Sequence, residues 1–142
     1  MQELTKVKIA GREYPVKLDI NVLEEIQESY GSVSEFERDI LGLKYLKDEA
    51  GAQQYKEDGT PIIYAGEPSI KAIKLVLPLM INEGLKITAD WENKEFDRID
   101  AEEIYRECDV SFEVLAEIIK DEFRKCFAVK KQKPSKREKK NR

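Results

Sequence analysis

Near the start of the chain, apolar residues alternate with polar ones in the pattern of a two-stranded β-hairpin. Val7 and Ile9 share one face of the first strand, Tyr14 and Val16 share one face of the second, and Gly11 marks a turn between them. A lone hairpin is only marginally stable in water. We therefore expect a hairpin whose apolar face lies on another part of the protein.

This hairpin should cover residues 4–18 and carry Pro15 in its second strand. Proline has no N–H to donate, so its strand should lie at a sheet edge or place the proline at a position that makes no ladder hydrogen bond.

Five later segments carry apolar residues at helical spacing. The expected helices cover about residues 22–30, 35–50, 69–83, 101–108 and 111–128. Candidate N-caps are Asn21, Ser32 or Ser34, Asp100, and Asp109 or Ser111, and candidate stops are Gly31, Gly51 and Gly84. The segment 69–83 is apolar nearly all round, so it should lie centrally, with a kink at Pro78.

Two segments interrupt the helical pattern. In residues 51–68, Asp58-Gly59 favours either a second hairpin or a mobile loop, and residues 85–99 fit a loop or a short strand. The expected fold class is thus α+β, mostly α. A hairpin caps a small bundle of about five helices in a single domain over residues 1–128.

The last residues differ sharply in charge from the rest. The segment from Lys130 to the end has eight Lys or Arg and one Glu, a net of +7, and the formal total of −4 leaves −11 for the residues before it. Residues 129–142 lack apolar residues for a core, so we expect a disordered, flexible basic tail. Its expected contact residues are Lys130, Lys131, Lys133, Lys136, Arg137, Lys139 and Lys140.

Several kinds of chemistry have no signature in the sequence. The chain has no histidine, its seven glycines are isolated, and the carboxylates of residues 90–100 lack the spacing of a calcium loop. We therefore expect neither an enzyme nor a cofactor or metal site. Cys108 and Cys126 should be reduced, half-buried thiols.

The chain also has no apolar run long enough to span a bilayer, since the segment 75–81 is short and contains Pro78. The first residues show no hydrophobic signal-peptide region. We therefore expect a cytoplasmic protein that has no membrane partner.

The sequence resembles the small tail assembly chaperones of long-tailed bacteriophages and prophages, especially those of low-GC Gram-positive hosts. The resemblance begins in the hairpin and continues through an asparagine-led helix that ends in an aromatic residue and glycine. It covers residues 4 to about 127, and relative to the family residues 51–68 look like an insertion. The matching positions are Ile9, Gly11, Tyr14, Pro15, Val16, Leu18, Asn21, Leu23, Ile26, Tyr30, Gly31, Ser32 and Glu35.

This resemblance implies a binding protein of the bacterial host cytoplasm. Members of the family keep the long tape-measure protein soluble, bring tail-tube subunits to it, and are absent from the mature virion. Here an amphipathic tape-measure segment would lie against exposed apolar side chains between helices. The residues proposed for partner binding are Leu75, Leu79, Trp91 and Phe112.

Two alternatives remain open. A nucleic-acid-associated regulator would use the basic tail, although the acidic body and the absence of aromatic residues from the tail argue against nucleic acid as a partner. A small hydrolase or transferase would need paired carboxylates in a closed pocket with a raised pKa. The sequence leaves the oligomeric state open.

Overall fold

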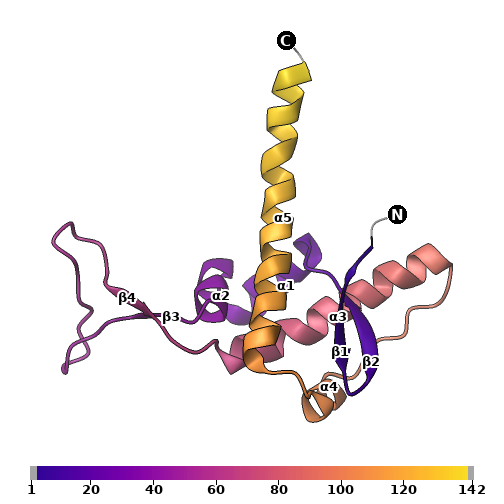
Figure 1. The fold of residues 1–142 in the computed structure, drawn as a ribbon, viewed down its shortest axis with the longest axis horizontal. Coiled ribbons are helices and arrows are strands. Elements are labelled where there is room, and N and C mark those ends of the chain that lie inside the picture. Colours follow the sequence, from indigo (N-terminus) through magenta and orange to yellow (C-terminus); the bar gives the residue numbers. More distant parts are fainter. Residues whose placement is uncertain (1–2, 141–142) are drawn as a thin grey trace.

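A computed structural model describes the backbone of residues 3–140 and the side chains of residues 3–127. Within these residues the chain forms an N-terminal antiparallel hairpin, five helices, and a smaller two-stranded sheet in an arm that projects from the body (Figure 1). The elements are β1 (Thr5–Ile9), β2 (Arg12–Val16), α1 (Ile20–Tyr30), α2 (Val33–Ile40), β3 (Leu43–Tyr45), β4 (Ile63–Ala65), α3 (Ile70–Glu92), α4 (Ala101–Glu107) and α5 (Phe112–Lys140). The predicted α+β class is confirmed.

The N-terminal hairpin has the predicted register and the predicted apolar face. Ala10 and Gly11 form its two-residue loop with φ values of 51° and 82°, the positive pair that a type I′ turn requires. The apolar side chains of both strands are buried. They are Val7, Ile9, Tyr14, Val16 and, just beyond β2, Leu18.

The hairpin packs on α3, which lies at the centre of the fold as predicted. Helix α3 contacts β2 and all four other helices of the described chain. The backbone N–H of Lys17 donates to the carbonyl oxygen of Met80 at 3.0 Å, so the end of β2 is hydrogen-bonded directly to the helix.

Gly84 does not end α3, so the predicted helix end at residue 83 is wrong. The helix continues to Glu92 and ends at Asn93, which adopts the left-handed conformation. Gly84 is buried where β2 crosses the helix, and a Cβ there would stand 2.3 Å from the carbonyl oxygen of Pro15. Glycine is needed at this position for the close approach of two backbones.

Pro78 lies inside α3 and removes one helical hydrogen bond, because it has no N–H for the carbonyl of Lys74. The hydroxyl of Tyr105, on α4, donates to that carbonyl oxygen at 2.6 Å. The Lys74 ammonium lies 4.7 Å from the centre of the Tyr105 ring. Tyr105 thus supplies the donor that Pro78 lacks and attaches α4 to the central helix.

The helix caps match the sequence only in part. Asp19, rather than Asn21, caps α1 by accepting from the backbone N–H groups of Asn21 and Val22. The predicted caps Ser32 and Asp100 are confirmed for α2 and α4.

Of the two candidate caps for the last helix, Ser111 accepts from the N–H of Val114 at its start. The other, Asp109, accepts from the N–H of Ala10 and so attaches the loop before α5 to the hairpin turn.

The predicted helix over residues 35–50 is wrong in its second half. Helix α2 ends at Ile40, and the next residues form β3, which pairs with β4. Gly42 has a φ of 74°, and a Cβ there would stand 2.4 Å from the carbonyl oxygen of Gly66. Pairing with residues distant in sequence therefore overrides the helical spacing of Leu43 and Leu46.

At the other end of the chain, α5 extends past the predicted end at residue 128. The predicted tail contacts, Lys130 to Lys140, lie outside the described side chains, so the expectations for the tail stay predictions.

None of the described helices is long and apolar enough to cross a membrane. Cys108 and Cys126 are half-buried free thiols, as predicted.

Replacing Gly84 by alanine should destabilise the protein. The added methyl group meets the backbone of Pro15 and Val16, so α3 and β2 must separate, and such overpacking costs about 2–3 kcal/mol. Urea unfolding followed by circular dichroism measures this loss. Lys86→Ala, at an exposed position of the same helix, is the control and should change stability little; equal losses for the two variants would contradict the close approach.

Tyr105→Phe should lower the free energy of unfolding by about 1 kcal/mol, since the Lys74 carbonyl loses its donor. In the Pro78→Ala background the restored N–H serves that carbonyl, so the same substitution should cost much less there. The four proteins form a double-mutant cycle that urea unfolding measures. A coupling energy of zero would show that Tyr105 does not act through the carbonyl left by Pro78.

Candidate binding groove

An apolar groove of about 510 Å³ lies between α2 and α5. Helix α5 and the shorter α2 lie side by side there (Figure 1). The groove is lined by Glu37, Ile40, Leu41, Lys120, Phe123, Arg124 and Phe127. Ile40 and Phe123 are buried in its floor, whereas Leu41 and Phe127 are exposed.

The floor of the groove is the outer end of a row of aromatic rings that begins in the core. Tyr30 meets Phe36 edge to face at 5.6 Å, Phe36 stacks on Phe123 at 6.2 Å, and Phe123 contacts Phe127 at 5.1 Å. Such contacts hold rings in fixed relative orientations. The row therefore places Phe127 on a rigid support rather than on a mobile surface.

The inner end of this row is fixed by polar contacts. The hydroxyl of Tyr30 donates to the carboxylate of Asp39, and the Lys71 ammonium lies 5.5 Å from the ring centre. Burial, followed by the hydrogen bond to Asp39, raises the pKa of Tyr30. The phenol is therefore protonated at neutral pH and remains a donor.

Charged side chains rim the groove on its α5 side. Lys120 pairs with Glu117 at 2.6 Å and Arg124 pairs with Asp121 at 3.3 Å, in both cases one turn apart on the helix. The hydrogen bond and positive charge of Lys120 lower the pKa of Glu117. Surface pairs of this kind contribute little to stability, so they can exchange partners when another charged surface approaches.

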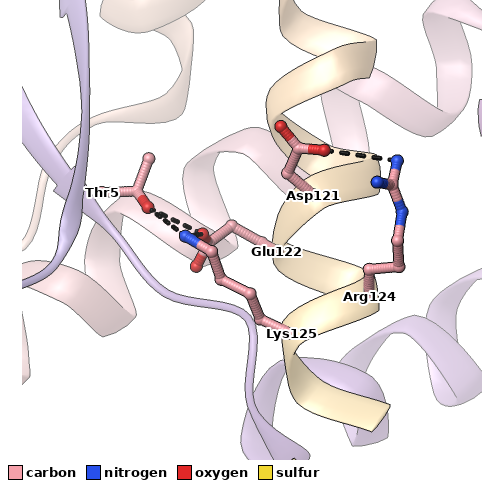
Figure 2. Close-up of polar contacts among 5 residues, drawn as sticks. All are labelled: Thr5, Asp121, Glu122, Arg124 and Lys125. Carbon is pink, nitrogen blue, oxygen red and sulfur yellow. Dashed lines mark hydrogen bonds and ion pairs between the residues drawn. The ribbon is translucent and has the colours of Figure 1, made fainter. Parts of the chain in front are cut away.

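The opposite face of α5 is fixed to β1 by a buried carboxylate. Glu122 accepts from the hydroxyl of Thr5 at 2.8 Å and from the Lys125 ammonium at 3.0 Å, and this ammonium also donates to Thr5. Figure 2 shows this cluster on one side of the helix and the Asp121–Arg124 pair on another. The cluster sets the rotation of α5 that turns Phe123 and Phe127 toward α2.

The residues proposed from the sequence for partner binding do not line this groove. Leu79 is half-buried in a second hollow that Phe96 also lines, and Phe112 is exposed beside a small third hollow between α3, α4 and α5. Leu75 is half-buried, and Trp91 is exposed near the end of α3. These four residues therefore do not share one binding surface with the α2–α5 groove.

Sequence reasoning missed the groove because its residues have the pattern of a core. Phe123 and Phe127 continue an apolar stripe of the last helix, and Ile40 continues that of the second. The one available signal was that this stripe continues past Phe123 to Phe127, close to the basic tail. Helix α2 ends at Ile40, and Ile40 and Leu41 at this end line the groove with Phe127.

The second hollow, of about 330 Å³, is lined in part by Glu83, whose carboxyl interacts with that of Asp19. Burial raises the pKa of Asp19 to about 6, and the hydrogen bond and negative charge of Glu83 add to this effect. The same hydrogen bond lowers the pKa of Glu83. The side-chain amide of Asn21 donates to Glu83 at 3.0 Å, which holds the Glu83 carboxyl beside the start of α1.

This pair has a structural task, because Asp19 is also the cap of α1. The hollow is open, and no cluster of three carboxylate or thiol groups suited to a metal occurs among the described side chains. The pair is the nearest match to the carboxylates that the hydrolase alternative requires.

Asp19→Asn should abolish a loss of stability between about pH 4 and pH 6. The raised folded-state pKa of Asp19 means that its contribution is fully present below the unfolded value near 3.8 and is lost as the pH rises through about 6. Asparagine still caps the helix and carries no charge. At neutral pH the variant should be more stable than wild type by about 1 kcal/mol or less, after allowance for solvent exposure.

Urea midpoints at about pH 5 and about pH 7 measure the effect. Glu24→Gln removes an exposed charge from the same hollow and should leave the pH dependence intact. An Asp19→Asn protein that weakens with pH as wild type does would exclude Asp19 as the cause.

Comparison with known proteins gives no match to this chain, whether to a protein-family model, to a curated protein sequence or to a solved structure. The function therefore has to be inferred from the residues and from the geometry of the groove.

Proposed function

We propose that this protein is a tail assembly chaperone of a long-tailed bacteriophage or prophage, which acts in the cytoplasm of the bacterial host. In this role it binds the tape-measure protein and tail-tube subunits, keeps them soluble and promotes tail assembly, and it is absent from the mature virion. The proposal rests on the resemblance of residues 4 to about 127 to that family.

The observation that carries the proposal is the α2–α5 groove, with its aromatic floor and charged rim. An amphipathic helix buries its apolar face in a groove of this kind through residues spaced three and four apart. Phe127 and Leu41 would contact that face, while Lys120 and Arg124 would meet charges along its edge. A tape-measure segment with this pattern would be protected from aggregation while it is bound.

The charge of the chain supports the same role. The acidic body keeps net charge away from zero, and 38% of all residues are charged, which favours a soluble complex around an aggregation-prone client. No step of this mechanism needs a catalytic group. The proposed contacts of Leu75, Leu79, Trp91 and Phe112 would extend the bound surface beyond the groove.

Co-expression with a tape-measure fragment from the same genome, followed by a soluble pull-down, tests the proposal. The fragment should be insoluble alone and should co-purify with the wild-type chain. Phe127→Ser should reduce the recovered fragment about tenfold, as the loss of a buried aromatic anchor does at other interfaces.

Phe96→Ser is the matched control, because Phe96 is 37% exposed and Phe127 is 36% exposed. It should leave capture unchanged. Capture that survives Phe127→Ser but is lost in Phe112→Ser would move the site to the surface proposed from the sequence.

The nucleic-acid alternative predicts a different pattern. Binding to duplex DNA would fall steeply with salt and would disappear when residues 130–142 are deleted. A fragment that stays insoluble, together with DNA that is retained at low salt, would replace the chaperone proposal by this one.

A further inference from the structure

The arm between α2 and α3 projects from the body and carries exposed apolar side chains (Figure 1). Two small lobes extend from its β3–β4 ribbon, with Gly51 and Gly59 at positive φ in their turns. Apolar side chains with more than two fifths of their surface exposed include Leu46, Tyr55, Ile63 and Tyr64. This surface has no core beneath it.

A ring of backbone hydrogen bonds joins the lobes to the ribbon. The N–H of Leu46 donates to Ile62 at 2.8 Å, Ile62 donates to Gln54 at 3.0 Å, and Gln54 donates to Leu46 at 2.9 Å. The ring closes on itself, so each of the three residues both donates and accepts. The ribbon therefore ends in a fixed junction, which holds β3 and β4 in a defined orientation.

The outer edge of β4 is an open set of hydrogen-bonding groups. Leu46 bonds to Ile62 and Gly66 bonds to Gly42, so the pair Lys44–Tyr64 between them is also a hydrogen-bonded position. The N–H and C=O groups of Ile63 and Ala65 consequently point away from β3. In the described chain β4 pairs with β3 alone.

This edge lacks the features that usually prevent strand pairing. From Gly59 to Gly66 no residue is charged, in a chain with 38% charged residues. All three residues of β4 are exposed, and none is lysine or proline. Native proteins protect exposed edges with charge, proline or a cover, so an uncharged, exposed edge is suited to pairing.

We propose that the β4 edge of one chain pairs with the β4 edge of a second copy, antiparallel about a two-fold axis at Tyr64. Ile63 of each chain then lies opposite Ala65 of the other. Their outward N–H and C=O groups bond in both directions, because the sequence of donors and acceptors along this edge is self-complementary under that rotation. The product is a four-stranded sheet in the order β3, β4, β4, β3.

The β4 edge is better suited than the β3 edge to pairing with a second copy. Strand β3 contacts α2, and Tyr45 accepts a hydrogen bond from Arg38 at 2.7 Å, so that edge is partly covered by its own chain. Strand β4 lies on the projecting arm (Figure 1), and its three uncharged residues bring no like charges together although the chain has a net charge of −4. So small an interface should give a weak dimer, populated at about 100 μM.

The test is disulfide capture with Tyr64→Cys. Residues on the two-fold form a non-hydrogen-bonded pair with Cα atoms about 4.5 Å apart, which is within the range that a disulfide spans. The native thiols are first removed by Cys108→Ser and Cys126→Ser in every chain of the test, since both are free and partly exposed. Mild oxidation of the full chain should then produce a reducible covalent dimer of about twice the 16.5 kDa chain mass. Tyr55→Cys is the control, since Tyr55 is equally exposed on the same arm but lies off the edge; it should cross-link about tenfold more slowly.

Adding Ala65→Pro to the Tyr64→Cys chain should suppress the cross-link about tenfold, since proline removes the outward N–H and leaves the bond to β3 intact. Circular dichroism checks that both chains remain folded. Three results would each overturn the proposal. The first is equal cross-linking at positions 55 and 64, and the second is cross-linking that persists with proline at 65. The third is a wild-type chain that sediments as a monomer at about 100 μM. If the wild-type chain is a monomer, the β4 edge would instead be available to pair with an extended segment of a different protein.

Discussion

The structure depends on the close approach of one strand to one helix. Gly84 lets the backbone of β2 lie directly on α3, and the hydrogen bond from Lys17 to Met80 fixes the crossing point. The hairpin gains a support for its apolar face, and α3 is covered on that side. Every other helix packs on α3 as well, so this crossing sets the frame within which α2 and α5 can meet.

Two other departures from regular secondary structure are compensated by residues far away in the sequence. Pro78 leaves the Lys74 carbonyl without its helical donor, and Tyr105 supplies one from α4. Gly42 lies just after α2 at a positive φ, and the residues that follow it, 43–45, pair with residues 63–65. In each case a local break in the helical pattern becomes a tertiary contact.

The proposed functional surfaces both arise at the end of α2. Ile40 and Leu41, at the end of this helix, line the groove together with the exposed Phe127. Because the chain then enters β3, the arm projects and its β4 edge is free of the body. A helix that continued to residue 50, as the apolar spacing predicts, would contain the residues of β3. The groove and the arm thus adjoin one helix boundary.

The sequence alone determined the hairpin, its apolar face, the central place of α3 and the existence of five helices. These features follow from periodicity and from turn residues such as Gly11, which act locally. It did not determine the end of α2 or the role of Gly84, since each depends on a partner distant in the chain. The cap at Asp19 is local, and the sequence analysis placed it two residues too late, at Asn21. The groove could not be predicted either, because the spacing of Phe123 and Phe127 along the helix is the same whether their apolar stripe is buried by other elements or exposed. Only the tertiary structure decides which part of an apolar stripe other elements bury.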